Sequence, residues 1–230
     1  MKEAIWSRVG PAAGLLFFPV VMIGFFIHRY PDIRPSDAQL ASWLATVNAS
    51  TFRLGVYVEA LGIMLLIPFA AWLYFQLRQG ARDASWPAVA MLAAAIGWVV
   101  ISLQINEAWV GLLDQARNGL DIRVAQTVVS INQATYDMTG VVHGVTILAA
   151  GVAIIRGGAM ARWVGWAAVI IGVFLVASGP FGTDATPFGI LGYIWILAVG
   201  GYYAIRPPRT RHVVAAPTQR SVATGLPAIS

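Results

Sequence analysis

The stretch that decides the fold covers residues 86–156. It reads WPAVAMLAAAIGWVVISLQINEAWVGLLDQAR over residues 86–117, turns at Asn118-Gly119, and continues as LDIRVAQTVVSINQATYDMTGVVHGVTILAAGVAIIR over residues 120–156. Asn-Gly is typical of a helix end, so each arm is predicted to be one long apolar helix. At 1.5 Å per residue the first arm would be roughly 45 Å long, whereas a bilayer core is about 30 Å thick. The two arms are therefore predicted to cross a membrane as a helical hairpin and to extend beyond it.

The composition of the whole chain also indicates a membrane protein. Of the 230 residues, 58% are hydrophobic and 11% are charged, whereas about a quarter of the residues in soluble domains are charged. The chain has no cysteine, which excludes disulfides, thiolate metal sites and cysteine nucleophiles. The first apolar run is too long for a signal peptide and lacks a small-residue cleavage site, so we expect it to remain as the first span.

Hydropathy and helix start signals predict an all-α, polytopic membrane helix bundle with six transmembrane helices. The spans are expected at about residues 9–27, 51–77, 86–105, 137–155, 163–178 and 187–205. They belong to one membrane domain over residues 1–206, in which residues 107–136 form a long outer hairpin between spans three and four. Pro19 and Pro68 lie inside spans one and two, where we expect kinks.

Two further segments have their own predicted structure. Ser36 and Gln39 form a capping box before an apolar pattern with helical spacing. This pattern predicts an amphipathic helix at about residues 37–47 that lies on the outer membrane surface or caps the bundle. Residues 207–230 are basic and Pro-rich, and we expect them to be a disordered cytoplasmic tail.

The distribution of charge predicts the orientation of the bundle. The N-terminus, the connections after spans two and four, and the C-terminal tail together carry ten basic and two acidic residues. The opposite side carries five basic and eight acidic residues. Because Lys and Arg collect on the cytoplasmic side, both termini are predicted to be cytoplasmic. Topology thereby accounts for the net charge of +5, and no nucleic-acid partner is expected.

Counting along each span from its cytoplasmic end gives the depth of each polar residue. About 19 residues of helix correspond to roughly 28 Å, which is one hydrocarbon thickness. The count predicts a polar layer at the outer boundary, formed by His28, Glu59, Gln104, Glu107, Asp137 and Asp184. Such a layer can bind a cation, a metal or an amine, and it is also where polar residues meet headgroups and water. Gly55 and Gly62 flank Glu59 on nearly the same face, which indicates that Glu59 faces inward.

His143 is predicted to lie inside the hydrocarbon, roughly 20 Å above the inner boundary. Tyr193 falls at the same depth, and Trp98 and Trp195 are close to it. An ionisable residue at this depth is a functional candidate. The alternative is a neutral imidazole that joins helices through a hydrogen bond to Tyr193 or to a carbonyl.

Glycines recur on several predicted spans and indicate close packing between helices. The spacings are those of Gly10 with Gly14, of Gly140 with Gly144, and of the series Gly165, Gly172 and Gly179. The same glycine-rich faces would also allow the chain to form an oligomer.

The sequence predicts a non-enzymatic function without a cofactor. It contains no Gly-rich phosphate loop, no Ser-centred elbow and no His-Glu-x-x-His helix. In the leading interpretation the chain is a binding or accessory subunit in the lipid bilayer that presents residues 107–136 and the polar vestibule to a ligand or protein partner. One alternative is a small cation- or proton-coupled transporter that uses Glu59, Asp137 and His143. A second is an intramembrane enzyme with a metal at the outer carboxylates.

Two short segments resemble uncharacterised six-span membrane families that are abundant in bacteria. They are WLYFQLR at residues 72–78, which closes span two, and ARWVGW at residues 161–166, which opens span five. The resemblance implies a multi-pass protein of the bacterial plasma membrane. It implies no activity and no site residue.

Overall fold

The computed structural model describes residues 2–31, 35–79, 85–181 and 186–206. In these ranges the chain forms helices without any strand, in the order α1 (Lys2–His28), α2 (Asp37–Thr46), α3 (Ala49–Met64), α4 (Leu66–Arg78), α5 (Ser85–Arg117), α6 (Ile122–Gly157), α7 (Arg162–Phe181) and α8 (Thr186–Ile205). The predicted tail at residues 207–230 and the candidate Asp184 lie outside the described residues.

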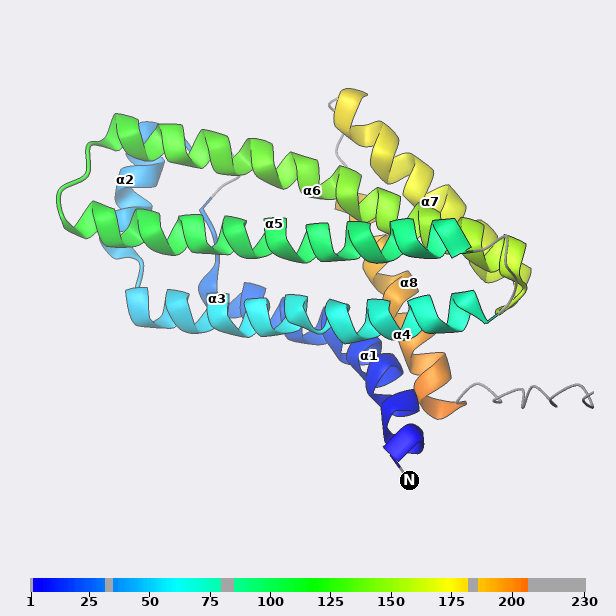
Figure 1. Ribbon diagram of the computed structural model, residues 1–230. Helices are drawn as coiled ribbons and strands as arrows, with labels where there is room; N and C mark the ends of the chain where they lie inside the picture. Colours follow the sequence, from blue (N-terminus) through cyan, green and yellow to red (C-terminus); the bar gives the residue numbers. More distant parts are fainter. Residues whose placement is uncertain (1, 32–34, 80–84, 182–185, 207–230) are drawn as a thin grey trace, which may run out of the picture.

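The two longest helices, α5 and α6, lie side by side and meet in a short turn at one end of the molecule (Figure 1). They contain 33 and 36 residues, so each is about 50 Å long. In the turn Gly119 has a φ of +85°, a conformation that suits glycine. Asp121 then caps α6, because its side chain accepts a hydrogen bond from the Arg123 amide at 2.7 Å.

Five helical segments are long and apolar enough to cross a membrane: Arg8–His28, Ala49–Arg78, Ser85–Arg117, Ile122–Gly157 and Pro187–Ile205. The apolar part of α7, Arg162–Ser178, is shorter. The prediction of an all-helical bundle with membrane-type helices is confirmed, whereas the sixth crossing and the orientation stay predictions. α5 and α6 also pass without a break from the predicted spans into the predicted outer hairpin.

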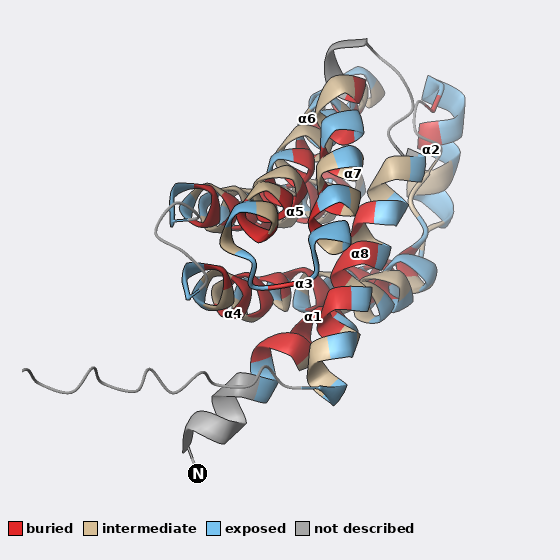
Figure 2. Ribbon diagram, turned by 90° about the vertical axis from the view of Figure 1, so that its right-hand side faces the viewer, coloured by how far each residue is buried: buried red, intermediate tan, exposed pale blue. Residues whose placement is uncertain are grey.

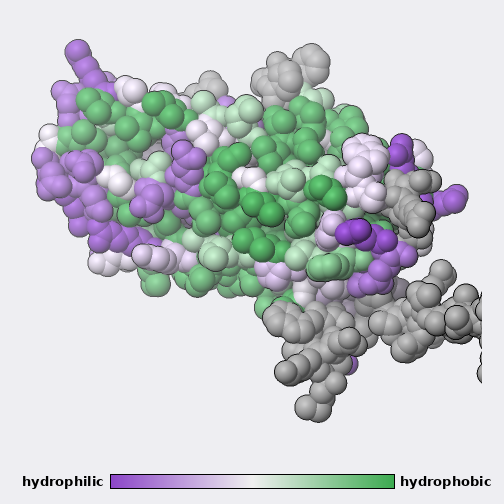
Figure 3. Space-filling model, viewed as in Figure 1, coloured by the Kyte–Doolittle hydropathy of each residue, from purple (hydrophilic) through white to green (hydrophobic). Residues whose placement is uncertain are grey.

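The surface has the polarity of a membrane protein. Hydrophobic residues cover the middle of the molecule, and hydrophilic residues gather at the end where α5 meets α6 (Figure 3). Large apolar side chains such as Phe26, Leu61 and Val100 are more than half exposed. Soluble monomers rarely expose apolar surface on this scale, so the lipid bilayer is the medium that suits it.

Predicted span two consists of two helices, because the chain leaves regular α-helical geometry at Leu65. The Leu65 amide bonds the Gly62 carbonyl at 3.0 Å, which is a tighter turn than the α-helix makes. Pro68 lacks an N–H group, and its ring crowds the carbonyl four residues earlier, that of Met64. The α-helix is therefore interrupted at Leu65, just before the proline at which the sequence predicts a kink. α1 continues as one helix through both of its prolines.

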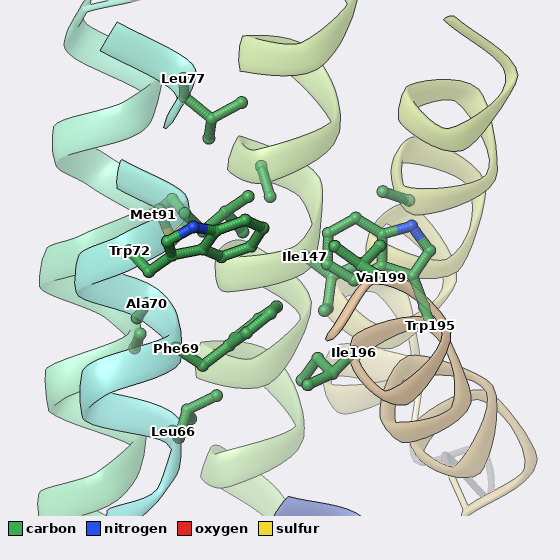
Figure 4. Close-up of a cluster of buried hydrophobic side chains, with 14 of the residues drawn as sticks. Leu66, Phe69, Ala70, Trp72, Leu77, Met91, Ile147, Trp195, Ile196 and Val199 are labelled. Carbon is green, nitrogen blue, oxygen red and sulfur yellow. The ribbon is translucent and has the colours of Figure 1, made fainter. Parts of the chain in front are cut away.

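The main hydrophobic core lies between α4, α5, α6 and α8. Figure 4 shows Trp72, Met91, Ile147 and Ile196 as members of this cluster, one from each of these helices. The buried residues lie on the helix faces that meet inside the bundle, and the exposed residues lie on its outer faces (Figure 2).

Glycines bring several helices into close contact within the chain. A Cβ added to Gly10 would lie 2.1 Å from the Cβ of Trp72, and one added to Gly172 would lie 2.6 Å from the Leu148 amide nitrogen. Comparable collisions would occur at Gly14, Gly144, Gly151, Gly165 and Gly200. These faces are covered by neighbouring helices of the same chain, so they are not free to join two copies. This packing therefore does not favour the oligomer that the glycine spacing predicts, and the oligomer stays a prediction.

α2 caps one end of the bundle. The Ser36 side chain accepts a hydrogen bond from the Gln39 amide, and the Gln39 side chain accepts one from the Ser36 amide, as the sequence predicts. Leu40 is completely buried in a small cluster with Leu112 of α5 and Val129 of α6. This packing agrees with the predicted position at the bundle end, and the relation of α2 to the membrane surface stays a prediction.

A second small cluster and an ion pair connect α3 to the same end. Phe52 of α3 and Leu113 of α5 are buried together, and Arg53 pairs with Asp114 of α5. We refer to this end of the molecule as the headpiece. It consists of α2, residues 49–56 of α3, residues 109–117 of α5 and residues 122–133 of α6.

Candidate functional site

Two buried histidines are the main polar features of the apolar bundle. His28 ends α1, and His143 lies in the middle of α6. Each is only 3% exposed. Both are candidates from the sequence, and their surroundings differ completely.

The His28 imidazole pairs with Glu59 of α3. Its Nε2 lies 2.8 Å from Glu59 Oε2, and its Nδ1 lies 3.1 Å from the Phe25 carbonyl oxygen. Because a carbonyl only accepts hydrogen bonds, Nδ1 carries a proton in this arrangement and Nε2 faces the carboxyl group. The His28 side chain has no exposed surface, and that of Glu59 is 13% exposed.

Glycines bring α1 and α3 close enough for this pair to form. A Cβ on Gly24 would lie 2.4 Å from the Glu59 amide nitrogen, and one on Gly55 would lie 2.6 Å from the Cβ of His28. A Cβ on Gly62 would collide with α1 as well. Any larger residue at these positions would push the two helices apart. This packing agrees with the inward-facing position that the flanking glycines predict for Glu59.

Two residues that the sequence analysis missed, Tyr30 and Asn106, complete the cluster. Tyr30 Oη lies 3.2 Å from Glu59 Oε2 and 3.0 Å from Asn106 Oδ1. Arg29 has a φ of +45°, in the left-handed region. This conformation ends α1 and places the Tyr30 ring 4.2 Å from the His28 ring. We call His28, Tyr30, Glu59 and Asn106 the His28 cluster.

Aromatic rings surround the His28 cluster. Phe25 and Phe52 have their ring centres 5.9 and 5.4 Å from that of His28, and Trp109 lies 5.5 Å from Tyr30. Burial, and after it the Glu59 charge, raises the pKa of Tyr30 far above that of an ordinary phenol. The Tyr30 hydroxyl is therefore protonated at neutral pH and available as a donor.

The remaining members of the predicted outer polar layer do not join this cluster. Gln104 and Glu107 are exposed on α5, whereas Asn106 between them is buried. Gln104 and Glu107 are three residues apart and so share a face of α5, but this spacing does not say which face meets a neighbouring helix. Asp137 is exposed on α6, where it accepts a hydrogen bond from Gln133 at 3.3 Å. The layer is thus divided between the inside and the outside of the bundle.

Ring stacking holds His143 in place. Its ring centre lies 3.9 Å from that of Trp98 and 5.1 Å from that of Tyr193, with interplanar angles of 16° and 24°. Its Nε2 is buried without a hydrogen-bond partner among the described residues. Gly192 makes room for the ring, since a Cβ there would lie 2.4 Å from Nε2. The hydrogen bond expected from a structural histidine is not found at this nitrogen.

The other aromatic candidate, Trp195, has a separate role. Its indole N–H donates to the Val164 carbonyl of α7 at 3.1 Å, and its ring belongs to the main core (Figure 4). It therefore connects α8 to α7, whereas Tyr193 connects α8 to the His143 stack. The Tyr193 hydroxyl lies within electrostatic range of Glu59.

The structure gives little support for a metal site. Within the described residues, no three His, Asp or Glu side chains come together in a way that would hold a metal ion. Glu59 already contacts His28, while Glu107 and Asp137 are exposed. Among the described residues, the carboxylates on which the metal-enzyme alternative depends are therefore not grouped.

A groove runs along α6 from the headpiece to Asp137, one turn beyond it. It is lined by Pro35, Gln126, Val129, Ser130, Gln133, Ala134 and Asp137. The Gln126 side-chain amide donates to the Pro35 carbonyl at 2.8 Å, which holds the segment before α2 against α6. The groove therefore offers hydroxyl, amide and carboxylate groups on a fixed helix.

Comparison with known proteins identifies a family and no activity. The family model described as "Domain of unknown function (DUF4386)" matches residues 12–204, which include most of α1 and nearly all of α8. A comparison with curated proteins and one with solved structures each found no match. The family model matches most of the length of the chain, so the chain belongs to the DUF4386 family.

Proposed function

We propose that this member of the DUF4386 family is a non-enzymatic membrane protein that binds a ligand or an accessory partner through its headpiece. The observation that carries the proposal is the separate core of the headpiece. Leu40 and Leu113 are fully buried there, and the Arg53–Asp114 ion pair links α3 to α5. A segment that only connected two spans would need neither an added helix nor a core, whereas a binding surface needs a rigid support.

The outer surface of the headpiece supplies the binding groups. The end of the molecule at the α5–α6 turn is hydrophilic (Figure 3), and the groove on α6 adds a concave polar site. Ser130 and Gln133 offer hydrogen-bonding groups, and the Asp137 carboxylate favours a cationic group such as an amine. The ligand class that suits this lining is a polar molecule with a positive charge.

The proposal places the headpiece outside a bacterial plasma membrane, with six spans and cytoplasmic termini. The excess of Lys and Arg at the opposite end of the bundle supports this orientation. Because the chain has no cysteine, single cysteines at Asp121 and Gln79 test it directly. An impermeant thiol reagent added to intact cells should label the first and spare the second. The reverse pattern would contradict the orientation.

Photo-crosslinking tests binding at the groove. A photoreactive residue at Ser130 should form a discrete adduct that saturates as its partner is supplied in excess. The same residue at Val100, on the apolar surface, should react only with lipid. Adducts that are the same at both positions would mean that the groove has no specific ligand.

A second candidate function is cation- or proton-coupled transport, which the His28–Glu59 pair favours. Of the three residues considered for this role, Glu59 pairs with His28, His143 stacks on Trp98, and Asp137 is exposed. A buried carboxyl group with a histidine partner is a common means of carrying a proton through a membrane protein. Flux into proteoliposomes under a pH gradient should then stop in Glu59→Gln and persist in Glu107→Gln. Equal flux in both variants would reject transport through Glu59.

A further inference from the structure

The spacing between His28 and Glu59 implies a shared proton. Nε2 and Oε2 are 2.8 Å apart, and two atoms with lone pairs come this close only when one of them carries a proton, although an N–H bond on Nε2 does not point directly at Oε2 in this arrangement. His28 Nδ1 already donates to the Phe25 carbonyl, so the shared proton is carried by Nε2 or by Oε2. The pair is an imidazolium with a carboxylate in the first case, and an imidazole with a carboxylic acid in the second. Its net charge is zero in both.

Tyr30 faces two acceptors but has a single hydroxyl proton. Its Oη is 3.0 Å from Asn106 Oδ1 and 3.2 Å from Glu59 Oε2. If the hydroxyl donates to Asn106, Glu59 can bond to Tyr30 only by donating, which requires a protonated carboxyl group. The hydrogen-bond chain then runs from Glu59 to Tyr30 to Asn106.

Turning the Asn106 amide by 180° reverses this chain. Nδ2 is buried and has no partner within the described part of the protein when Oδ1 faces Tyr30. After the turn Nδ2 donates to Tyr30 Oη, and Tyr30 donates to the Glu59 carboxylate, which also accepts from His28. The buried Asn106 Nδ2 then has an acceptor. The direction of the chain thus depends on whether Glu59 is ionised.

Few other charges act on the cluster. In the described residues the groups facing it are His28 on α1, Tyr30 after α1, Glu59 on α3, Asn106 on α5, and, within electrostatic range, Tyr136 on α6 and Tyr193 on α8. Arg53 and Asp114 pair with each other, and Glu107 is exposed. The raised pKa of Tyr30, caused by burial and by Glu59, keeps that hydroxyl neutral. Glu59 and His28 are therefore the groups whose charge can change.

We propose that His28 and Glu59 form a proton-binding site, and that proton uptake by Glu59 reverses the hydrogen-bond chain through Tyr30 to Asn106. The added proton forms an O–H bond on the carboxylate while the imidazolium keeps its own proton. The Tyr30 hydroxyl proton turns from Glu59 to Asn106 Oδ1, and the charge of the pair changes from zero to +1. Because Asn106 belongs to α5, this step changes how α5 contacts α1 and α3. The proposal is independent of what the headpiece binds.

Infrared difference spectroscopy of the protein in lipid nanodiscs, between pH 8 and pH 4, tests the site. Acidification of the wild type should produce the C=O band of a protonated, buried carboxyl group. This band should be absent in Glu59→Gln and present in Glu107→Gln, whose substituted residue is exposed. A wild type without the band, or a band that survives in Glu59→Gln, would overturn the proposal.

The assignment can also be made without substituting Glu59. The chain has three glutamates, Glu3, Glu59 and Glu107, so ¹³C-labelled glutamate in the variant with Glu3→Gln and Glu107→Gln labels Glu59 alone. The acid-induced band should shift to the frequency expected for ¹³C. A band that does not shift would belong to an aspartate, and the site would be rejected.

Tyr30→Phe tests the chain separately from the site. The substitution keeps the ring and removes the hydroxyl, so the protonated Glu59 loses its acceptor. The band should remain and move to higher frequency, because a carboxyl group without that hydrogen bond has a stronger C=O bond. An unchanged frequency would show that Glu59 does not donate to Tyr30.

Discussion

The two buried histidines of this protein are equally inaccessible, yet opposite kinds of contact hold them. His28 has a carboxyl partner at 2.8 Å and a carbonyl at 3.1 Å. His143 packs against the nearly parallel rings of Trp98 and Tyr193, and no carboxylate pairs with it among the described residues. His28 is at a helix end, where other polar residues can reach it. His143 is at mid-helix, where aromatic rings are its neighbours.

This difference shows that burial alone does not determine what a histidine does. A buried polar group that gains a charged partner can exchange a proton, because the partner stabilises the charged form. A group that gains only stacking contributes mainly packing between helices. The comparison therefore predicts that substitutions around His28 change stability through charge, and that those around His143 change it through shape.

Removal of the carboxyl partner should have the largest effect. Glu59→Leu would leave His28 Nε2 without its partner in a buried site, and breaking a buried pair in this way costs about 3–5 kcal/mol. SDS titration of the purified protein in mixed micelles measures the free energy of unfolding. The control Glu107→Leu changes an exposed residue and should alter it by less than about 0.5 kcal/mol. Equal losses in the two variants would mean that the pair does not stabilise the fold.

A methyl group beside His143 should have the next largest effect. Gly192→Ala would place a Cβ 2.4 Å from His143 Nε2, and overpacking of this kind costs about 1–3 kcal/mol. Gly189→Ala on the same helix is the matched control, since a Cβ there has no neighbour within 4 Å. In the double variant with His143→Ala, most of the cost should disappear. A cost that stays the same would place the clash elsewhere.

Loss of the Tyr30 hydroxyl should have a smaller effect at neutral pH and a distinct effect in alkali. Tyr30→Phe leaves buried acceptors unpaired, at a cost of about 1–2 kcal/mol. Because burial raises the pKa of Tyr30 in the folded protein, its contribution is complete below about pH 10 and is lost as the pH rises above that value. The free energy of unfolding should therefore fall less steeply above pH 10 in Tyr30→Phe, by up to about 1.4 kcal/mol per pH unit. Identical slopes would show that Tyr30 ionises normally.

The smallest effect is expected for His143→Phe. The variant keeps a flat ring against Trp98 and Tyr193 and removes no hydrogen bond at Nε2. Exchanges that preserve shape cost little, here less than about 1 kcal/mol. Unfolding in SDS measures the change, and near-UV circular dichroism reports whether the stack persists. A loss as large as that of Glu59→Leu would mean that His143 has a polar partner after all.

The sequence predicted the secondary structure well because its signals are local. The turn at Asn118-Gly119, the capping box at Ser36 and the helix interruption before Pro68 each depend on a few consecutive residues. Apolar stretches of sufficient length likewise predict membrane-type helices from composition alone. The continuous α5 and α6 were divided at the expected membrane boundary, because hydropathy changes there and helical structure does not.

The candidate site could be predicted only in part. Depth along the spans placed His28 and Glu59 at one level, and glycine spacing indicated the inward face of Glu59. The same reasoning selected Glu107 on α5, although Asn106 is the residue that reaches the cluster. A shift of one residue turns a side chain by about 100° around a helix, and depth does not report that rotation.

The sequence by itself therefore determined the helices, their order and the composition of a membrane bundle, since these depend on hydropathy and on local backbone chemistry. Only the tertiary structure decided which polar residues meet. The Tyr30 hydroxyl joins Glu59 across 29 positions and Asn106 across 76, and His143 faces Gly192 on α8. Such contacts are set by the rotation of each helix about its axis and by the close approach that glycines permit. No single helix carries that information, because it arises only when the helices pack.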